Sequence, residues 1–244
     1  MTRNPSKIYK YHVANLKELE IAISQVARLT TAAIASTDPQ RSLRTLNRLH
    51  AFLIGSWAET RLNKLLNEEF GFTDSERQRI ESFSTQLDRW TNTIDLAFRK
   101  HHNKPKAELN ADNIGVAHAA RRHALHDVLE KELRIIIEIR NKLAHGQWFY
   151  PLNSDNTAVE QEKYKLINNE NALSLRIKYS LIGYLADATH DLVVSPKTFE
   201  RDFEKHFRGL FQARKNLVTR KYAGYAARLV QDRQRARQAK KKVD

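Results

Sequence analysis

The residues with the clearest chemical potential lie in one stretch, from Ile135 to Gly146. Arg140 offers a guanidinium fork that matches the oxygens of a phosphate group. His145 offers an imidazole, which titrates near neutral pH and can act as a general acid or base. Asn141 lies between them and supplies an amide for hydrogen bonding. Together, these side chains could bind a phosphate ester and move protons beside it.

Helical periodicity places Arg140 on an apolar face, which is a costly position for a charged group. At about 100° per residue, the leucines and isoleucines of the stretch surround Arg140 in an apolar arc of about 200°. Asn141 and His145 lie together on the neighbouring edge. Two alternatives involve no chemistry: Arg140 forms a buried ion pair, for example with Glu59, and His145 is a surface histidine at a helix end.

Four long helices are predicted to position this stretch. Apolar residues recur with helical spacing over residues 12–36, from Asp38-Pro39 to about 70, over 73–100 and over 116–145. The segment Thr73-Asp74-Ser75-Glu76 is typical of a capping box, and Gly146 is typical of a residue that ends a helix. The polar segment 101–113 is predicted to be a loop. Short connections between long helices predict an antiparallel bundle.

A change of pattern later in the chain predicts a small β-hairpin insertion near residues 160–179. Hydrophobic residues alternate with polar ones on both sides of Asn168-Asn169-Glu170-Asn171. A helix is expected to resume at Ser180, and Ser195-Pro196 opens a last helix that becomes basic toward its end. The predicted fold class is therefore mainly α, with a helical bundle, a hairpin insertion and a long basic C-terminal helix.

Composition excludes several classes of protein. The 244 residues include only 7 Gly and 5 Pro, which disfavours a turn-rich all-β fold and leaves no glycine-rich loop for nucleotide phosphates. The absence of cysteine excludes disulfides, thiolate metal sites and cysteine nucleophiles. No apolar run approaches the length of a membrane span, and no apolar segment typical of a signal peptide follows the first residues. We expect a cytoplasmic protein without a membrane partner.

The charge distribution indicates a polyanionic partner. The net charge is +14, and residues 214–244 contribute 11 Lys or Arg and 2 Asp, which makes +9 of the +14. We divide the chain into a bundle over 1–195 and a basic C-terminal helical extension over 196–244. The extension either contacts nucleic acid or is a solvated tail. The residues expected to bind RNA are Lys142, Arg233, Arg235 and Arg237.

The sequence Arg140-Asn141-Lys142-Leu143-Ala144-His145 resembles the R-polar-x(3–5)-H motif of the HEPN superfamily. This family comprises small helical-bundle proteins of prokaryotic defence, toxin–antitoxin and RNA-processing systems, and its motif closes a long helix. In architecture the resemblance extends over about residues 12–195. The chain departs from the family at Gln147, where HEPN toxins paired with nucleotidyltransferase antitoxins often carry a tyrosine; the nearest tyrosine here is Tyr150.

The resemblance implies a metal-independent endoribonuclease that cleaves RNA by attack of the RNA's own 2′-hydroxyl, without a cofactor. Arg140 would hold the scissile phosphate, His145 would transfer protons and Asn141 would orient the site. A homodimer with a composite active site is expected, because one chain supplies a single motif histidine and the reaction benefits from two proton-transfer positions. A further partner would be an antitoxin or another component of a defence system.

Histidines elsewhere in the chain do not predict a metal site. His118, His123 and His126 follow His101 and His102, but no carboxylate-rich set with recognisable metal-ligand spacing accompanies them. Polar-face histidines are the favoured interpretation, with contact to RNA as a further role. We therefore expect no metal.

The aromatic residues fall into two groups, those predicted to pack in the core and those that could stack on nucleotide bases. Trp57 and Trp90 lie in the helical apolar pattern and are predicted to pack in the core. Trp148, Phe149 and Tyr150 directly follow the motif and could either pack or stack on nucleotide bases.

Three functional hypotheses follow. The first is an endoribonuclease of HEPN type acting in cell defence or as a toxin. The second is a catalytically inactive basic helical RNA-binding module. The third is a membrane-surface helix near residues 217–230, whose apolar face is narrow. Cleavage of RNA that depends on His145 distinguishes the first hypothesis from the second.

Overall fold

Helices account for most of the chain in the computed structural model, which describes residues 6–36 and 40–240, the side chains of Arg237 and Lys240 excepted. The elements are α1 (Lys7–Ile34), α2 (Gln40–Leu66), α3 (Asp74–Glu81), α4 (Gln86–His101), α5 (Ala111–Ile114), α6 (Val116–Val128), the π-helical turn η1 (Leu129–Leu133), α7 (Arg134–Ala144), α8 (Gln161–Asn169), α9 (Ala172–Val194), α10 (Pro196–Thr219) and α11 (Tyr222–Lys240). The predicted mainly helical bundle is confirmed. The predicted start of the second helix at Asp38-Pro39 lies outside the described residues.

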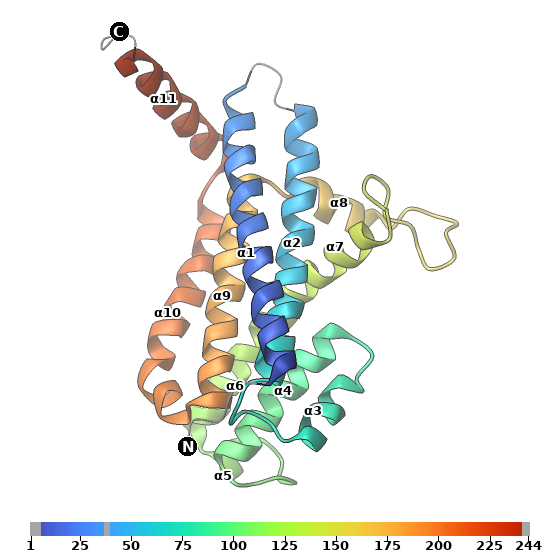
Figure 1. Ribbon diagram of the computed structural model, residues 1–244, viewed down its shortest axis with the longest axis vertical. Helices are drawn as coiled ribbons and strands as arrows, with labels where there is room; N and C mark the ends of the chain where they lie inside the picture. The colour runs from blue at the N-terminus through green and yellow to red at the C-terminus, as the bar shows by residue number, and fades with distance from the viewer. Residues whose placement is uncertain (1–5, 37–39, 241–244) are drawn as a thin grey trace.

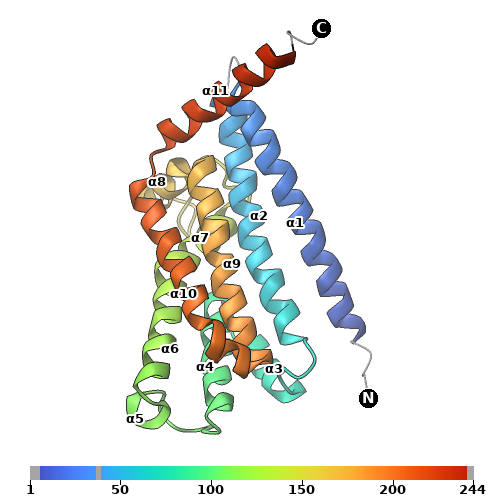
Figure 2. The ribbon, with the colours of Figure 1, turned by 90° about the vertical axis from the view of Figure 1, so that its left-hand side faces the viewer.

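Helix α9 forms the centre of the bundle. It packs against α10 on one side and against α1 and α2 on the other, while α4 packs against its lower half (Figures 1 and 2). Leu181, Ile182 and Leu185 in its middle are fully buried. The exposed residues of α9 form only a narrow stripe, so its apolar residues cover a wider arc than those of a surface helix.

The predicted β-hairpin is wrong: its residues fold as α8 and as the first turns of α9. Within the described residues no strand forms, and the one β-bridge joins Leu152 and Val159. Asn171 caps α9, because its side chain accepts a hydrogen bond from the backbone N–H of Ser174 (3.0 Å) and the Ser174 hydroxyl accepts one from the backbone N–H of Asn171 (3.0 Å). The polar segment is therefore a helix junction, and the alternation beyond it lies on a helix with a wide buried arc.

The predicted helix over 73–100 is two helices. Its start is confirmed, because Thr73 and Glu76 form a capping box, with the carboxylate of Glu76 2.8 Å from the backbone N–H of Thr73. Helix α3 ends at Glu81, and Thr85 begins α4 by accepting a hydrogen bond from the backbone N–H of Asp88 (3.0 Å).

The C-terminal region also divides into two helices. Helix α10 belongs to the core: Phe199 and Phe203 are buried, and the guanidinium of Arg214 pairs with Asp127 (2.6 Å) and Glu132 (2.8 Å). Residues 196–219 of the expected extension thus pack with the bundle. Helix α11 leaves it at an angle and crosses the end of α1 (Figure 2).

Among the described residues, no helix combines the length and the apolar character needed to cross a bilayer.

Candidate functional site

The end of α7 brings the motif residues to the surface. Arg140 and Asn141 lie in the last turn of α7, and His145 is the first residue after it. Gly146 has a positive φ of 76°. Backbone hydrogen bonds from Gly146 to Leu143 (3.1 Å) and from Gln147 to Lys142 (3.0 Å) close the helix in the way that the glycine predicts. The motif is therefore held at a sharply defined helix end.

The side chain of Arg140 is fixed between α7 and α2. Its stem crosses α2 at Gly55, where an added Cβ would overlap the Arg140 Cβ and lie 2.8 Å from its Cγ. Its guanidinium donates to Glu59 and, at 3.1 Å, to the side-chain oxygen of Asn141. The Nε atom is buried and has no hydrogen-bond partner among the described residues. The ion pair with Glu59, one of the alternatives raised by the sequence, is thus present.

His145 and Asn141 are exposed beside this ion pair. The imidazole of His145 has no hydrogen-bond or ion-pair partner among the residues that the structure describes. The side chain of Arg140 keeps 26 % of its exposure, so it is half-buried and reachable from solvent. One surface thus presents a fixed cation, an amide and an unengaged imidazole, which can bind an anion and exchange protons with it.

The four residues expected to bind RNA occupy different environments. Lys142 is held inside the fold, where its ammonium group pairs with Glu160 (2.7 Å) and donates to the carbonyl of Leu152. Arg233 and Arg235 are exposed on α11, and Arg233 also donates to the carbonyl of Ala32 (2.8 Å). Arg237 lies on the same helix, and its side chain is outside the described part of the chain. The structure does not gather these residues with Lys142.

A cluster of cations and aromatic rings lies just beyond the motif. Phe149 and Tyr150 are exposed, and their ring centroids are 4.5 Å apart. The guanidinium groups of Arg44 and Arg48, both from α2, lie 5.3 and 5.5 Å from the Phe149 ring centroid. Trp148 instead packs inward, and its indole N–H donates to the carbonyl of Leu143 (3.0 Å). The cluster presents flat faces and positive charge, which are the features that bind single-stranded nucleic acid.

Sequence reasoning missed Arg44 and Arg48, because their spacing on α2 shows only one polar edge of a helix. Arg48 is buried, its guanidinium donates to Asn168 (2.9 Å), and burial lowers its pKa. The predicted core positions of Trp57 and Trp90 are confirmed, since both are buried.

The histidines gather in a different set from the one considered in the sequence. His123 is exposed, and His126 pairs with Asp95 (2.7 Å). The side chains of His101, His102 and His118 instead converge, with one possible ligand atom from each within 4.8 Å of the others. No local spacing predicts this arrangement, because it depends on the packing of α4 against α6.

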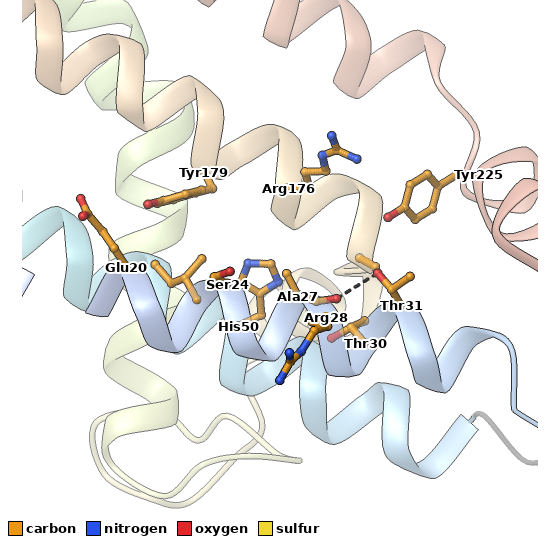
Figure 3. A pocket seen from close by; sticks show the side chains of 12 residues that line it. Glu20, Ser24, Ala27, Arg28, Thr30, Thr31, His50, Arg176, Tyr179 and Tyr225 are labelled. Carbon is orange, nitrogen blue, oxygen red and sulfur yellow. Dashed lines mark hydrogen bonds between the residues drawn. The ribbon is translucent and has the colours of Figure 1, made fainter. Parts of the chain in front are cut away.

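A groove of about 470 Å³ lies between α1 and α9 (Figure 3). His50 from α2 forms part of its floor, and Tyr179 and Tyr225 line it from α9 and α11. Burial lowers the pKa of His50 to about 4 and raises the pKa of Tyr179 to about 12. None of the three motif residues lines this groove, which lies on the opposite side of α2 from Glu59 and Arg140.

Comparisons of the chain with models of protein families, with curated proteins and with solved structures gave no match.

Proposed function

We propose that the protein is a metal-independent endoribonuclease of the HEPN type, acting in prokaryotic defence or as a toxin. The observation that carries the proposal is that Arg140, Asn141 and His145 lie within six residues at one exposed helix end, with Arg140 fixed by α2. An arginine on the apolar face of a helix needs a partner, and Glu59 supplies one while leaving part of the guanidinium accessible.

The residues fit cleavage by an internal nucleophile. The 2′-hydroxyl of the RNA loses its proton to an imidazole and its oxygen bonds to phosphorus, while the bond from phosphorus to the 5′-oxygen breaks and that oxygen takes up a proton. Arg140 stabilises the charge on the phosphate oxygens during this exchange. Asn141 holds the guanidinium through its side-chain oxygen and keeps its amide N–H groups for the sugar.

The cluster of Arg44, Arg48, Phe149 and Tyr150 supports RNA as the substrate. Bases next to the scissile phosphate would stack on the exposed rings, and the exposed guanidinium of Arg44 would face the RNA backbone, while the buried Arg48 supports the Phe149 ring. Three residues separate His145 from Phe149 in the chain, so bound bases would lie close to the motif.

The test is cleavage of a labelled single-stranded RNA by the wild type and by His145→Ala. We expect the substitution to reduce cleavage at least about a hundredfold, because a proton-transfer group is removed, while RNA affinity changes little. His123→Ala removes an exposed histidine from another helix and should leave cleavage unchanged. Equal cleavage by the wild type and His145→Ala would refute the assignment of His145.

The second candidate is an inactive helical RNA-binding module. It is favoured by the engagement of Arg140 with Glu59 and of Lys142 with Glu160, which neutralises the motif cations, while α11 presents exposed arginines. For this function, the wild type would bind RNA with a strong salt dependence and would show no cleavage that His145→Ala could abolish.

A further inference from the structure

Three histidines from separate parts of the chain converge at the lower end of the bundle. His101 is the last residue of α4, His102 follows it as the helix cap, and His118 lies in the first turn of α6. Their ring centroids lie 4.6 to 5.1 Å apart. One possible ligand atom from each lies within 4.8 Å of the others.

Glu200 from α10 supplies a fourth donor. One of its carboxylate oxygens lies 3.0 Å from Nε2 of His101 and 2.6 Å from Nε2 of His118. The other oxygen pairs with the guanidinium of Arg121 at 2.5 Å. Arg121 therefore orients the carboxylate and leaves one oxygen directed at the histidines.

The surroundings of the third histidine, His102, indicate a ligand site. Nε2 of His102 is buried and has no hydrogen-bond partner among the described residues. A buried imidazole nitrogen without a partner is costly, and this one belongs to a ring that lies beside two other histidines. Burial lowers the pKa values of His101 and His102, which favours the neutral imidazole that binds metals.

The scaffold behind the cluster is rigid. Phe98 and Phe199 are fully buried and meet edge to face at 5.9 Å, which joins α4 to α10. Phe98 also packs against the ring of His118 at 6.3 Å. The side chains of His101 and His118 keep less than a fifth of their exposure. The donors are therefore held close together by the core.

We propose that His101, His102, His118 and Glu200 bind one Zn²⁺ ion. Three imidazole nitrogens and one carboxylate oxygen suit zinc in tetrahedral coordination, where neighbouring donor atoms lie about 3.3 Å apart. One possible ligand atom from each histidine lies within 4.8 Å of the others, and the Glu200 oxygen lies 3.0 and 2.6 Å from His101 and His118, so side-chain rotations can bring the donors to that spacing. Four protein ligands leave no open position, so the ion stabilises the junction of α4, α6 and α10 and takes no part in a reaction.

Zinc binding to the full chain, without a histidine tag and dialysed against EDTA and then buffer, tests the proposal. We expect calorimetry with ZnCl₂ to show one ion per chain with a Kd below about 1 µM. Free zinc at a hundred times its Kd should raise Tm by about 5–10 °C. Co²⁺ in its place should show the intense visible absorption of tetrahedral coordination. A Kd above 1 µM, or a stoichiometry well below one, would overturn the proposal.

His102→Ala separates zinc binding from a hydrogen-bonded cluster. Because Nε2 of His102 has no hydrogen-bond partner in the part of the chain that the structure describes, a merely structural cluster loses no hydrogen bond at that atom. Zinc affinity should instead fall more than tenfold, whereas His123→Ala, an exposed histidine of the same region, should bind zinc like the wild type. A loss of less than tenfold for His102→Ala would overturn the assignment.

The zinc site and the proposed ribonuclease site can fail independently. His118 and His145 are separated by 27 residues of nearly continuous helix, which corresponds to about 40 Å. Chelation by EDTA should therefore lower Tm but leave the rate of RNA cleavage unchanged well below Tm. Calorimetry detects the zinc site even if the protein cleaves no RNA.

Discussion

His50 is a buried histidine whose two ring nitrogens both lack a hydrogen-bond partner among the described residues. It lies under the groove between α1 and α9, and the side chain of Arg176 also lines that groove. Burial lowers its pKa from 6.5 to about 4. The folded state therefore favours the neutral imidazole of His50, so the free energy of unfolding depends on pH.

We predict that His50 makes the protein less stable as pH falls from 6.5 toward 4. The folded pKa lies below the unfolded value, so the unfolded state binds more protons in this window and the free energy of unfolding decreases with falling pH. The contribution lost between pH 7 and pH 5 is about 2 kcal/mol. Denaturant titrations of the wild type and His50→Leu at both pH values measure it.

The comparison with His50→Leu isolates this residue from other titrating groups. Glu68 and Asp95 have pKa values of about 2 in the folded state, so they lower stability mainly at more acidic pH than this window. His12, His101 and His102 contribute equally to both proteins. If both proteins lost the same stability between pH 7 and pH 5, His50 would not be the cause.

At the scale of residues, the sequence predicts contacts between the faces of neighbouring helices. It does not predict which residues far apart in the chain come together. Glu59 could be named as a partner of Arg140, because a buried cation on one helix needs an acid on the next. Glu200 could not be named, since it lies 82 residues beyond His118 and meets it only after α10 folds back along α9. The candidate zinc site depends on that tertiary contact.

At the scale of elements, Gly55 allows α2 and α7 to approach each other closely at Arg140. We predict that Gly55→Ala destabilises the protein by up to about 2 kcal/mol. Alanine gains about 1 kcal/mol of helix propensity, but overlap with the first atoms of the Arg140 side chain costs about 1–3 kcal/mol. The steric cost exceeds the gain in helix propensity, because those atoms move only with the backbone of α7.

Gly183→Ala is the matched control for Gly55→Ala. Gly183 lies inside α9, and an added Cβ there meets nothing within 4 Å. This substitution should stabilise the protein by about 0.5–1 kcal/mol through helix propensity alone. Urea unfolding of both variants measures the difference, and a stabilised Gly55→Ala would contradict the close approach of α2 and α7.

Helical elements could be predicted where a helix has a narrow apolar face, and not where its buried arc is wide. The periodicity of α1 and of the motif helix follows one buried side, so both were predicted near their observed bounds. In α9, Leu173, Leu175 and Ile177 all fall within a wide buried arc, and their alternation with polar residues imitates a strand. The π-helical turn η1 also shifts the phase of the motif helix, which a fixed angle per residue does not reveal.

At the scale of the whole molecule, removing the basic end of α11 tests whether its charge contributes to RNA binding. Residues 231–244 contain six Lys or Arg and two Asp, a net +4. We predict that truncation after Val230 lowers the slope of log affinity against log salt for single-stranded RNA by up to about 4, if each cation contacts a phosphate. The truncation keeps Tyr222 and Tyr225, which pack against the core.

Replacing Arg233, Arg235 and Arg237 by glutamine in the full chain is the control for this truncation. It removes three charges and keeps the length of α11, so it should lower the same slope by up to about 2. The salt slope is obtained from fluorescence anisotropy titrations at several salt concentrations. An unchanged slope in both proteins would show that the tail is solvated and takes no part in binding.

The width of the apolar arc around Arg140 suggests a surface that a second chain would cover. The structure does not support a dimer through this arc. Ile136, Ile137 and Ile139 are buried within the chain, where Ala51, Ile54 and Leu175 lie beside them. A larger exposed apolar stripe lies on α10 and consists of Phe207, Phe211 and Val218. Figure 1 places α10 on the opposite side of the bundle from the end of α7. A dimer formed through that stripe would keep the two motifs apart.

The chemistry of the proposed site nevertheless predicts a composite dimer, because one His145 per chain must serve two proton transfers. An equal mixture of Arg140→Ala and His145→Ala chains would contain about half heterodimers, each with one Arg140 and one His145 around the phosphate. We expect such a mixture to cleave RNA at least about tenfold faster than either variant alone. Introducing Phe211→Glu into both chains should leave this recovery intact, since it disrupts only association through α10. A protein that sediments as a monomer at the assay concentration and still cleaves RNA would exclude the composite site.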